Sequence, residues 1–269
     1  MVGWILPVPV WSVLSSAPMA RSTDLPSSSD DPRLDGWYHT IELGGGLTSR
    51  GAYDLRSVLD CYGIPKSLAG KEVLDVATGD GFFAFEMEAR GAERVVAVDV
   101  ARVGDCDWTP RMRGRLGDFA DNTSWPDHFR LAHQMRGSRV DYRYCSVYDL
   151  SPYTVGTFDV VFCGSLLLHL QSPLLALHAI RSVTREMAII ETAAVKDLEE
   201  QFPGRPLISF GYQGEEAFAG ENTAYWVMTT AALEAMLRYA GFEVVEAQGT
   251  FVLPPVGSVA TAVVARPVT

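Results

Sequence analysis

Apolar and polar positions alternate along the chain with a period that changes repeatedly after residue 33. Short runs rich in valine, isoleucine and phenylalanine are separated by stretches in which apolar residues recur at helical spacing. Such alternation is typical of βαβ units and of a mainly parallel sheet. The short runs predict strands at 72–76, 94–98, 140–145, 158–163 and 187–192, and the longer stretches predict helices at 52–62, 82–90, 125–136, 173–182 and 229–240.

Two further strands close the pattern at the C-terminal end. They cover 242–247 and 258–265, and they are expected to pair as an antiparallel hairpin at the sheet edge. The fold class is therefore α/β: a Rossmann-like doubly wound sheet of seven strands, mostly parallel with an antiparallel last strand. A helical N-terminal segment is expected to precede it, and residues 33–269 are expected to form a single domain.

Two segments do not follow this alternation. Residues 1–32 are expected to be a disordered or extended tail. The first twenty of them are apolar, but they lack a basic start and are interrupted by Pro7 and Pro9, so neither a signal peptide nor a membrane span is expected. Met19 or a nearby codon is the simplest natural start. Residues 195–227 are rich in glycine, proline and aromatic residues and predict a long irregular insertion of functional importance.

Composition and charge restrict the possible partners. Hydrophobic residues make up 48% of the chain, as in a soluble globular protein, and the formal net charge is −11. Such a charge repels a phosphate backbone and disfavours nucleic acid as a partner. The four cysteines are scattered without a C-x-x-C pair, which predicts no metal site and no disulfide framework. Reduced thiols and a cytoplasmic location are expected.

A glycine-rich sequence joins the predicted strand at 72–76 to the helix that follows. The sequence is V-L-D-V-A-T-G-D-G over 73–81. Its glycines permit a tight turn and let a ligand approach the backbone closely. The residues expected to bind a cofactor here are Asp75, Ala77, Thr78, Gly79 and Gly81.

An acidic residue, Asp99, closes the next predicted strand eighteen residues beyond Gly81. A carboxylate at this place accepts hydrogen bonds from ribose hydroxyls. A dinucleotide-binding dehydrogenase has the same layout, but its G-x-G-x-x-G fingerprint needs a glycine where Ala77 stands. The carboxylate of Asp75 and the G-D-G turn favour a cationic sulfonium over a pyrophosphate. S-adenosylmethionine is therefore the expected cofactor, with S-adenosylhomocysteine as its product and no metal.

Two later segments are expected at the same edge of the sheet, because ligands bind beyond the carboxyl ends of parallel strands. Ser146, Val147 and Tyr148 follow the third strand, where they would surround the adenine. Cys163 and Gly164 end the fourth strand, which would face the transferred methyl group.

Several longer stretches resemble the class I methyltransferase family that contains the bacterial tRNA wobble-uridine carboxymethyl-transferring enzyme and its secondary-metabolite relatives. The stretches are W-Y-H-T-I-E-L-G-G-G (37–46), V-L-D-V-A-T-G-D-G-F-F-A-F-E-M-E (73–88), C-S-V-Y-D-L (145–150), F-D-V-V-F-C-G-S-L-L-L-H-L-Q-S-P (158–173) and L-E-A-M-L-R-Y-A-G-F (233–242). The chain departs from the family at Ala77-Thr78, where relatives carry Gly-Cys, and it lacks the basic set of the tRNA enzyme. The resemblance implies methyl transfer from S-adenosylmethionine to a small molecule, such as a biosynthetic intermediate in secondary metabolism.

The acceptor is expected to bind between residues 33–62, the end of the fourth strand and the insertion at 195–227. Aromatic side chains there suit a small-molecule pocket and a cationic sulfonium. The expected acceptor-binding residues are Trp37, Tyr38, Tyr53, Tyr225 and Trp226. His39 and His169 are the candidate general bases, although each could equally serve a structural role.

Two alternatives to this function stay open. One is an RNA-modifying methyltransferase, which would need a basic patch assembled from distant residues such as Arg111–Arg115, Arg136 and Arg139. The other is a protein that binds S-adenosylmethionine without transferring its methyl group. The acceptor, the methylated atom and the oligomeric state are not specified by these patterns.

Overall fold

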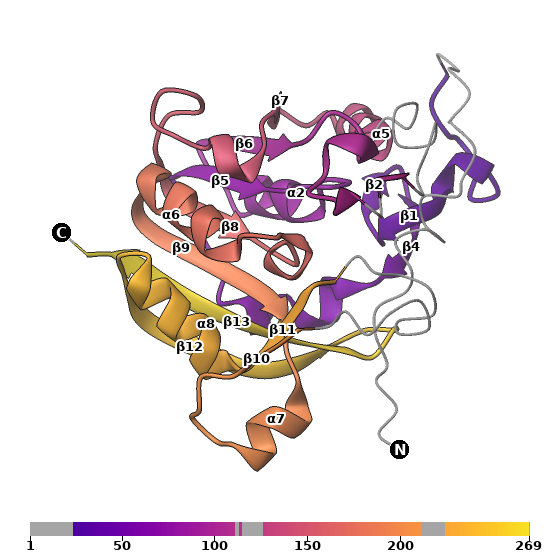
Figure 1. The fold of residues 1–269 in the computed structure, drawn as a ribbon. Helices are drawn as coiled ribbons and strands as arrows, with labels where there is room; N and C mark the ends of the chain where they lie inside the picture. The colour runs from indigo at the N-terminus through magenta and orange to yellow at the C-terminus, as the bar shows by residue number, and fades with distance from the viewer. Residues whose placement is uncertain (1–23, 111–112, 115–125, 211–223, 269) are drawn as a thin grey trace.

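A seven-stranded sheet forms the centre of the protein, with the strand order β12-β13-β9-β8-β5-β6-β7 (Figure 1). The computed structural model describes residues 24–110, 113–114, 126–210 and 224–268. β13 runs antiparallel to both of its neighbours, β12 and β9, and the other neighbouring pairs of this sheet are parallel. The strands are β5 (Glu72–Val76), β6 (Arg94–Asp99), β7 (Asp141–Tyr144), β8 (Phe158–Cys163), β9 (Thr184–Ala193), β12 (Phe242–Leu253) and β13 (Ser258–Pro267). The predicted doubly wound sheet with an antiparallel last strand is confirmed.

Helices cover both faces of this sheet, because alternate residues of its strands are buried on opposite sides. Val73 and Phe162 belong to a core shared with α2 (Phe82–Ala89), α5 (Asp127–Arg136) and the N-terminal segment. Leu74 and Cys163 belong to a second core shared with α6 (Pro173–Val183) and α8 (Thr230–Tyr239), the two helices in front of the sheet in Figure 1. A strand buried on both faces must be apolar at successive positions, which explains the uninterrupted run in β8.

The N-terminal segment differs from the helical segment that was predicted. It forms the short strands β1 (Asp35–His39), β2 (Glu42–Gly44), β3 (Leu47–Thr48) and β4 (Arg50–Tyr53), and its helical turns η1 (Pro32–Leu34) and η2 (Leu55–Tyr62) are 3-10. Parallel pairing of β1 with β4 extends Ala52 and Tyr53, so the helical turns begin only at Leu55. A Cβ on Gly51 would lie within 2.4 Å of the His39 backbone, so this pairing requires glycine.

The insertion at 195–227 is more regular than predicted in its described parts. It contains the helix α7 (Lys196–Gln201) and the strands β10 (Ile208–Phe210) and β11 (Trp226–Met228), which pair with each other. The long-range pairing of β10 with β11 cannot be read from the local pattern, which explains the difference. Residues 211–223 lie outside the described part, as do residues 1–23 of the predicted tail.

Residues 24–32, the end of the predicted tail, contact the domain through hydrogen bonds. Arg33 donates a hydrogen bond to the backbone oxygen of Asp24, and Arg50 donates to that of Ser29. No helix among the described residues is both long and apolar enough to span a membrane.

Phe162 provides a test of this core. Its side chain is 1% exposed and packs on Phe83 with ring centroids 4.2 Å apart. We expect Phe162→Ala to lower the free energy of unfolding by about 3–5 kcal/mol, because it leaves a cavity at the centre of the sheet. Urea unfolding followed by circular dichroism measures the change.

Phe202→Ala is the matched control, because the Phe202 residue is 46% exposed after α7. Its expected effect is below about 1 kcal/mol. Equal losses in the two variants would contradict the assignment of Phe162 to the core.

Candidate active site

The glycine-rich sequence forms a tight loop between β5 and α2. Ala77, Gly79 and Gly81 all have positive φ angles, of 59°, 58° and 92°. A Cβ on Gly81 would lie 2.5 Å from the ring of Phe85 and 2.7 Å from that of Phe129, so only glycine fits there. Ala77 occupies a left-handed conformation that glycine adopts at lower cost.

The Asp99 carboxylate holds this loop from the end of β6. Its Oδ2 accepts a hydrogen bond of 2.8 Å from the backbone N–H of Gly79, and its Oδ1 accepts one of 2.7 Å from that of Val100. The Thr78 N–H donates to the backbone oxygen of Val98, which ties the loop to β6 a second time. The sequence predicted that Asp99 lies beside the glycine loop, and the structure brings them into contact.

Asp75 lies beneath the loop and is fully buried. Its Oδ2 accepts a hydrogen bond of 2.6 Å from the Thr78 hydroxyl. Burial raises the pKa of Asp75 to about 7, partly offset by the Thr78 hydrogen bond. A carboxyl group in this state is stabilised as the anion by an approaching cation and destabilised by an approaching phosphate.

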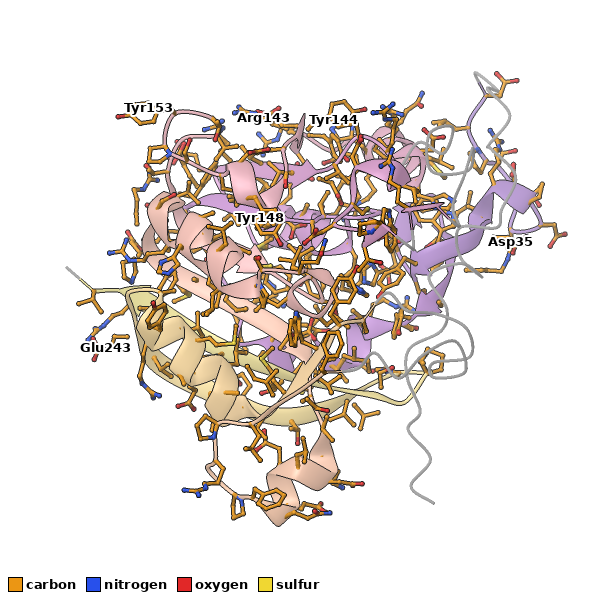
Figure 2. All side chains as sticks on the ribbon, in the orientation of Figure 1. Asp35, Arg143, Tyr144, Tyr148, Tyr153 and Glu243 are labelled. Atoms are coloured by element: carbon orange, nitrogen blue, oxygen red, sulfur yellow. The ribbon has the colours of Figure 1, made fainter. Side chains whose placement is uncertain are left out.

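The loops after β6, β7 and β8 meet at Asp107, which the sequence analysis did not single out. Its Oδ2 accepts hydrogen bonds from the Tyr148 hydroxyl, at 2.6 Å, and from the Gln171 N–H, at 2.7 Å. The Tyr225 hydroxyl donates to the backbone oxygen of Asp107 at 3.0 Å. Tyr148 (labelled in Figure 2) and Tyr225 were assigned to different parts of the site, and Asp107 joins them.

The other two residues predicted near the adenine lie beside Tyr148. Ser146 caps the 3-10 helix η4 (Val147–Asp149), where its hydroxyl accepts a hydrogen bond from the Tyr148 N–H. Val147 is 7% exposed and packs in the core with α6 and α8. Both residues thus follow β7, as the sequence predicted.

His39 connects β1 to the glycine loop through Asp80. Its Nδ1 lies 2.6 Å from Asp80 Oδ1, and its backbone N–H donates to Asp80 Oδ2 at 2.7 Å. The imidazole is also stacked on Phe82 and is 8% exposed as a residue. Because Nδ1 is occupied by Asp80, only Nε2 could face an acceptor.

The predicted acceptor-binding aromatics fall into three environments. Trp37 is fully buried and stacks on His128 with centroids 4.6 Å apart, so it belongs to the core. Tyr38 and Tyr53 pack against each other with centroids 5.0 Å apart, and burial raises the pKa of Tyr38 well above its usual value. Trp226, on β11, donates its indole N–H to the backbone oxygen of Leu170.

His169 lies in the 3-10 helix η5 (Leu167–His169), a few residues beyond β8. Its backbone N–H donates to the oxygen of Leu166 at 2.9 Å. Tyr225 N–H donates to the oxygen of Leu168 at 2.7 Å, so η5 and the segment leading into β11 are adjacent. The histidine is therefore placed between the end of β8 and the insertion, as the sequence predicted.

Glu191 lies near the end of β9, at the edge of the sheet where the parallel strands have their carboxyl ends. The sequence analysis did not single it out. It is 1% exposed, and its Oε2 accepts hydrogen bonds from the N–H and the hydroxyl of Ser165, at 2.8 and 2.9 Å. Burial raises the pKa of Glu191 to about 7, against the lowering effect of these bonds. The sequence could have indicated Glu191, because it is an ionisable residue inside the apolar run of a predicted central strand.

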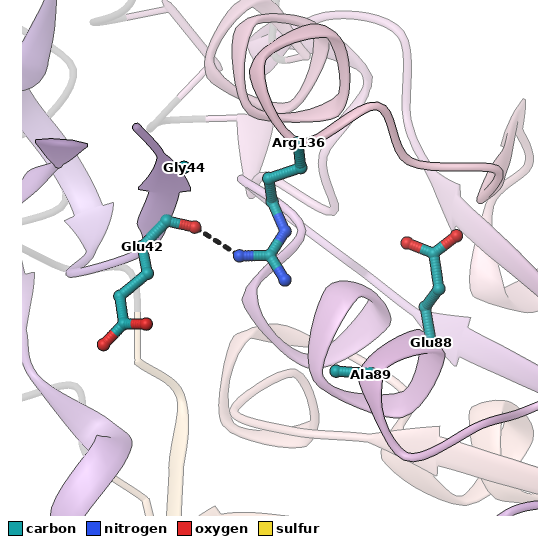
Figure 3. Close-up of a pocket in the computed structure, with 5 residues that line it drawn as sticks. All are labelled: Glu42, Gly44, Glu88, Ala89 and Arg136. Atoms are coloured by element: carbon teal, nitrogen blue, oxygen red, sulfur yellow. Dashed lines mark hydrogen bonds between the residues drawn. The ribbon is translucent and has the colours of Figure 1, made fainter. Parts of the chain in front are cut away.

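A separate cavity of about 330 Å³ lies away from this edge. Glu42, Gly44, Glu88, Ala89 and Arg136 line it (Figure 3). Ala89 ends α2 and Arg136 ends α5, so the cavity is at the opposite end of α2 from the glycine loop. Among the described residues, no group of three or more histidine, cysteine, aspartate or glutamate side chains could hold a metal ion.

The raised pKa of Glu191 has a measurable consequence for stability. The folded state holds its proton more tightly than the unfolded chain, so the stability that protonation contributes is present below about pH 4 and is lost as the pH rises through about 7. We expect Glu191→Gln, which cannot ionise, to be more stable than the wild type by about 3 kcal/mol at pH 8 and similar to it at pH 4. Urea unfolding at several pH values measures this.

Glu186→Gln is the control on the same strand, because Glu186 is exposed and pairs with Lys71. Its effect should stay below about 1 kcal/mol at every pH. A Glu191→Gln advantage that does not grow between pH 5 and pH 8 would show that Glu191 titrates normally.

The chain is similar in sequence to known proteins. A family model described as a methyltransferase domain matches residues 50–247. The ubiquinone biosynthesis O-methyltransferase of Azotobacter vinelandii is 34% identical over 119 residues, which cover 44% of this chain and 41% of that protein. The tRNA U34 carboxymethyltransferase of Pseudomonas paraeruginosa is 28% identical over 177 residues, 65% of this chain and 46% of that protein. The chain thus aligns with less than half the length of either relative.

A solved structure gives the same fold. The 1,6-didemethyltoxoflavin-N1-methyltransferase of Burkholderia thailandensis, crystallised with S-adenosylhomocysteine, superposes with a TM-score of 0.55 at 20% identity and covers 80% of each chain. The family model covers more than half of the sequence and includes the glycine loop, Asp99 and the strands that carry them. The chain therefore belongs to the methyltransferase-domain family, within the class I S-adenosylmethionine-dependent methyltransferases.

Proposed function

We propose that the protein transfers a methyl group from S-adenosylmethionine to a small-molecule acceptor, an intermediate of secondary metabolism. One observation carries this proposal: the glycine loop held by Asp99 lies next to a tyrosine-rich N-terminal segment, and His39 joins the two through Asp80. A cofactor cradle and an acceptor region are thereby coupled by direct hydrogen bonds.

The loop suits S-adenosylmethionine on two grounds. Its positive φ angles at Ala77, Gly79 and Gly81 bring backbone N–H groups to the edge of the sheet. The buried carboxyls of Asp75 and Asp99 give that edge a negative potential, which favours a sulfonium and an ammonium group. When bound, the cofactor supplies an electrophilic methyl group. The proposed contacts are Asp75, Ala77, Thr78, Gly79, Gly81, Asp99, Ser146, Val147, Tyr148, Cys163 and Gly164.

The acceptor side is proposed to consist of Tyr38, Tyr53, Tyr225 and Trp226, with Trp37 behind them in the core. Aromatic walls with a few hydroxyl groups are typical of small-molecule sites. The charge distribution also favours a small acceptor over RNA. Arg50, Arg94 and Arg185 each pair with a carboxylate, which reduces their attraction for phosphate.

The two histidines are assigned different tasks in this proposal. His39 positions the N-terminal segment over the loop, because Asp80 occupies its Nδ1. His169 stays a candidate proton acceptor, since η5 lies directly after β8. Methyl transfer is a displacement at carbon, so holding the acceptor in line and excluding water supplies much of the rate.

Asp99→Ala tests the cofactor site. We expect the dissociation constants of both S-adenosylmethionine and S-adenosylhomocysteine to rise roughly 10- to 100-fold, because a charged hydrogen-bond acceptor and the restraint on Gly79 are lost. Isothermal titration calorimetry measures both. Asp105→Ala is the control, since Asp105 is nearby and pairs only with exposed Arg102 in the described structure. Equal weakening in the two variants would argue against a specific role for Asp99.

An acceptor panel tests the rest of the proposal. The panel contains phenols, hydroxyquinones and heterocycles with N–H groups, together with unmodified bulk tRNA, and radiolabelled S-adenosylmethionine reports transfer. We expect label in the small-molecule fractions and none in tRNA at physiological salt. Label in tRNA alone would favour the RNA-modifying alternative. Binding of the cofactor without label anywhere would favour a protein that binds it for another purpose.

A further inference from the structure

Glu191 is a buried carboxyl group whose second oxygen has no partner. Oε2 accepts both hydrogen bonds from Ser165, whereas Oε1 is buried and has no hydrogen-bond partner in the described structure. An unpaired buried carboxylate oxygen costs free energy. Such a group persists in a central strand when it serves a purpose other than stability.

The position of Glu191 places it at the carboxyl edge of the sheet. Cys163, the last residue of β8, pairs with Ile190, so Glu191 is level with the turn that follows β8. Its side chain is on the same face as that of Ile189, and Phe162 and Asp75 follow on this face across β8 and β5. This face is the one that the N-terminal segment covers, beside the start of α2.

The turn after β8 is built around Glu191. Ser165 has a positive φ of 47°, which is unusual for a residue other than glycine, and its two bonds to Oε2 hold it there. A Cβ on Gly164 would lie 2.9 Å from the ring of Phe162 and 3.3 Å from Glu191 Oε2. The carboxyl group and the turn therefore form one unit, at the place where the methyl group is expected.

The other titratable groups around Glu191 are two tyrosines, a cysteine and one carboxyl group. Burial raises the pKa of Tyr38 on β1 and of Tyr62 in η2. The charge of Glu191 is the next cause for Tyr62, and for Tyr38 it follows the contribution of Tyr53. Cys163 on β8 likewise has its pKa raised by burial and then by the charges of Asp75 and Glu191. Asp75 on β5 is the one other group here with a pKa near 7, and Thr78 already bonds it. Glu191 therefore lies among two tyrosines, a cysteine and a second carboxyl group, and none of them donates a hydrogen bond to Oε1 in the described structure.

We propose that Glu191 is the proton acceptor of the methyl-transfer step, and that Oε1 faces the nucleophile of a neutral O–H or N–H acceptor. This inference rests on the proposed function. The acceptor oxygen or nitrogen forms a bond to the methyl carbon as the carbon–sulfur bond breaks, and the electron pair of that bond stays on sulfur. The O–H or N–H proton passes to Oε1. Acceptors of this class include phenols, enols and heterocycles with N–H groups.

The first test uses the cofactor pair and needs no acceptor. S-adenosylmethionine carries a positive sulfur and S-adenosylhomocysteine a neutral one, so a carboxylate beside the sulfur favours the former. An opposite charge at this range lowers a carboxyl pKa by at least about one unit. The preference for S-adenosylmethionine should therefore rise about tenfold as Glu191 ionises between pH 6 and pH 8. Calorimetric titration of both compounds at each pH measures the preference.

Three proteins are compared in that titration. Glu191→Gln keeps the shape and the acceptor for Ser165, so it should bind S-adenosylhomocysteine within about twofold of the wild type. It should lose most of the pH-dependent preference. Glu186→Gln, the exposed control on β9, should retain it. If Glu191→Gln still shows part of the pH-dependent preference, the same titration of Asp75→Asn tells whether Asp75 causes that part.

The second test uses the phenols and N–H heterocycles of the acceptor panel. We expect Glu191→Gln to lower kcat about 10²- to 10⁴-fold and to remove the acid limb of the pH–rate profile. Glu191→Asp should restore part of the rate, and His169→Asn should retain the limb. If His169→Asn loses the acid limb and Glu191→Gln keeps it, His169 is the proton acceptor and this inference is overturned.

The outcomes separate the inference from the proposed function. A Glu191→Gln protein with the wild-type cofactor preference at every pH overturns the role of Glu191 and leaves the methyl-transfer proposal intact. Wild-type protein that binds both cofactor forms with the predicted pH response but methylates no small molecule in the panel overturns the proposed acceptor class. The titration still places the carboxylate beside the sulfonium in that case.

Discussion

The carboxyl ends of the parallel strands meet at one edge of the sheet, and the rest of the site depends on how the loops there are held. β5 and β6 are neighbours, so the glycine loop after β5 lies within reach of Asp99 at the end of β6. The carboxylate accepts the Gly79 N–H and fixes a turn that contains left-handed residues. Glycine residues allow the loop several backbone conformations, and the hydrogen bond from Gly79 to Asp99 stabilises one of them.

Carboxyl groups are concentrated at this edge, and each is held by donors from a different element. Asp75 is bonded by Thr78, Asp80 by His39 and Glu191 by Ser165. Hydrogen bonds stabilise buried carboxylates, but they do not remove the negative potential that several of them create. A cation reduces that electrostatic cost on binding, whereas a pyrophosphate adds to it. The electrostatics thus agree with a sulfonium cofactor independently of any likeness to other proteins.

The same bonds connect segments that are far apart in the sequence. His39 and Asp80 join the N-terminal strands to the glycine loop, and Asp107 joins the loops after β6, β7 and β8 with Tyr225. Residues proposed for the cofactor and residues proposed for the acceptor are therefore joined by hydrogen bonds at two places. A change in one loop is expected to alter the position of the others, which is how remote residues come to influence an enzyme site.

The sequence alone determined the strands, the central helices and the glycine loop, because these depend on local periodicity and on backbone conformations that only certain residues adopt. β5 and β8 match their predicted bounds, and Asp99 was assigned from its place after a strand. Only the tertiary structure decided that the N-terminal segment would be strands, since β1 and β4 pair across an intervening hairpin. It also decided that Nδ1 of His39 would be occupied by Asp80, and that Glu191 would lie beside Ser165. Those facts depend on contacts between distant residues, and no local pattern of polar and apolar positions contains them.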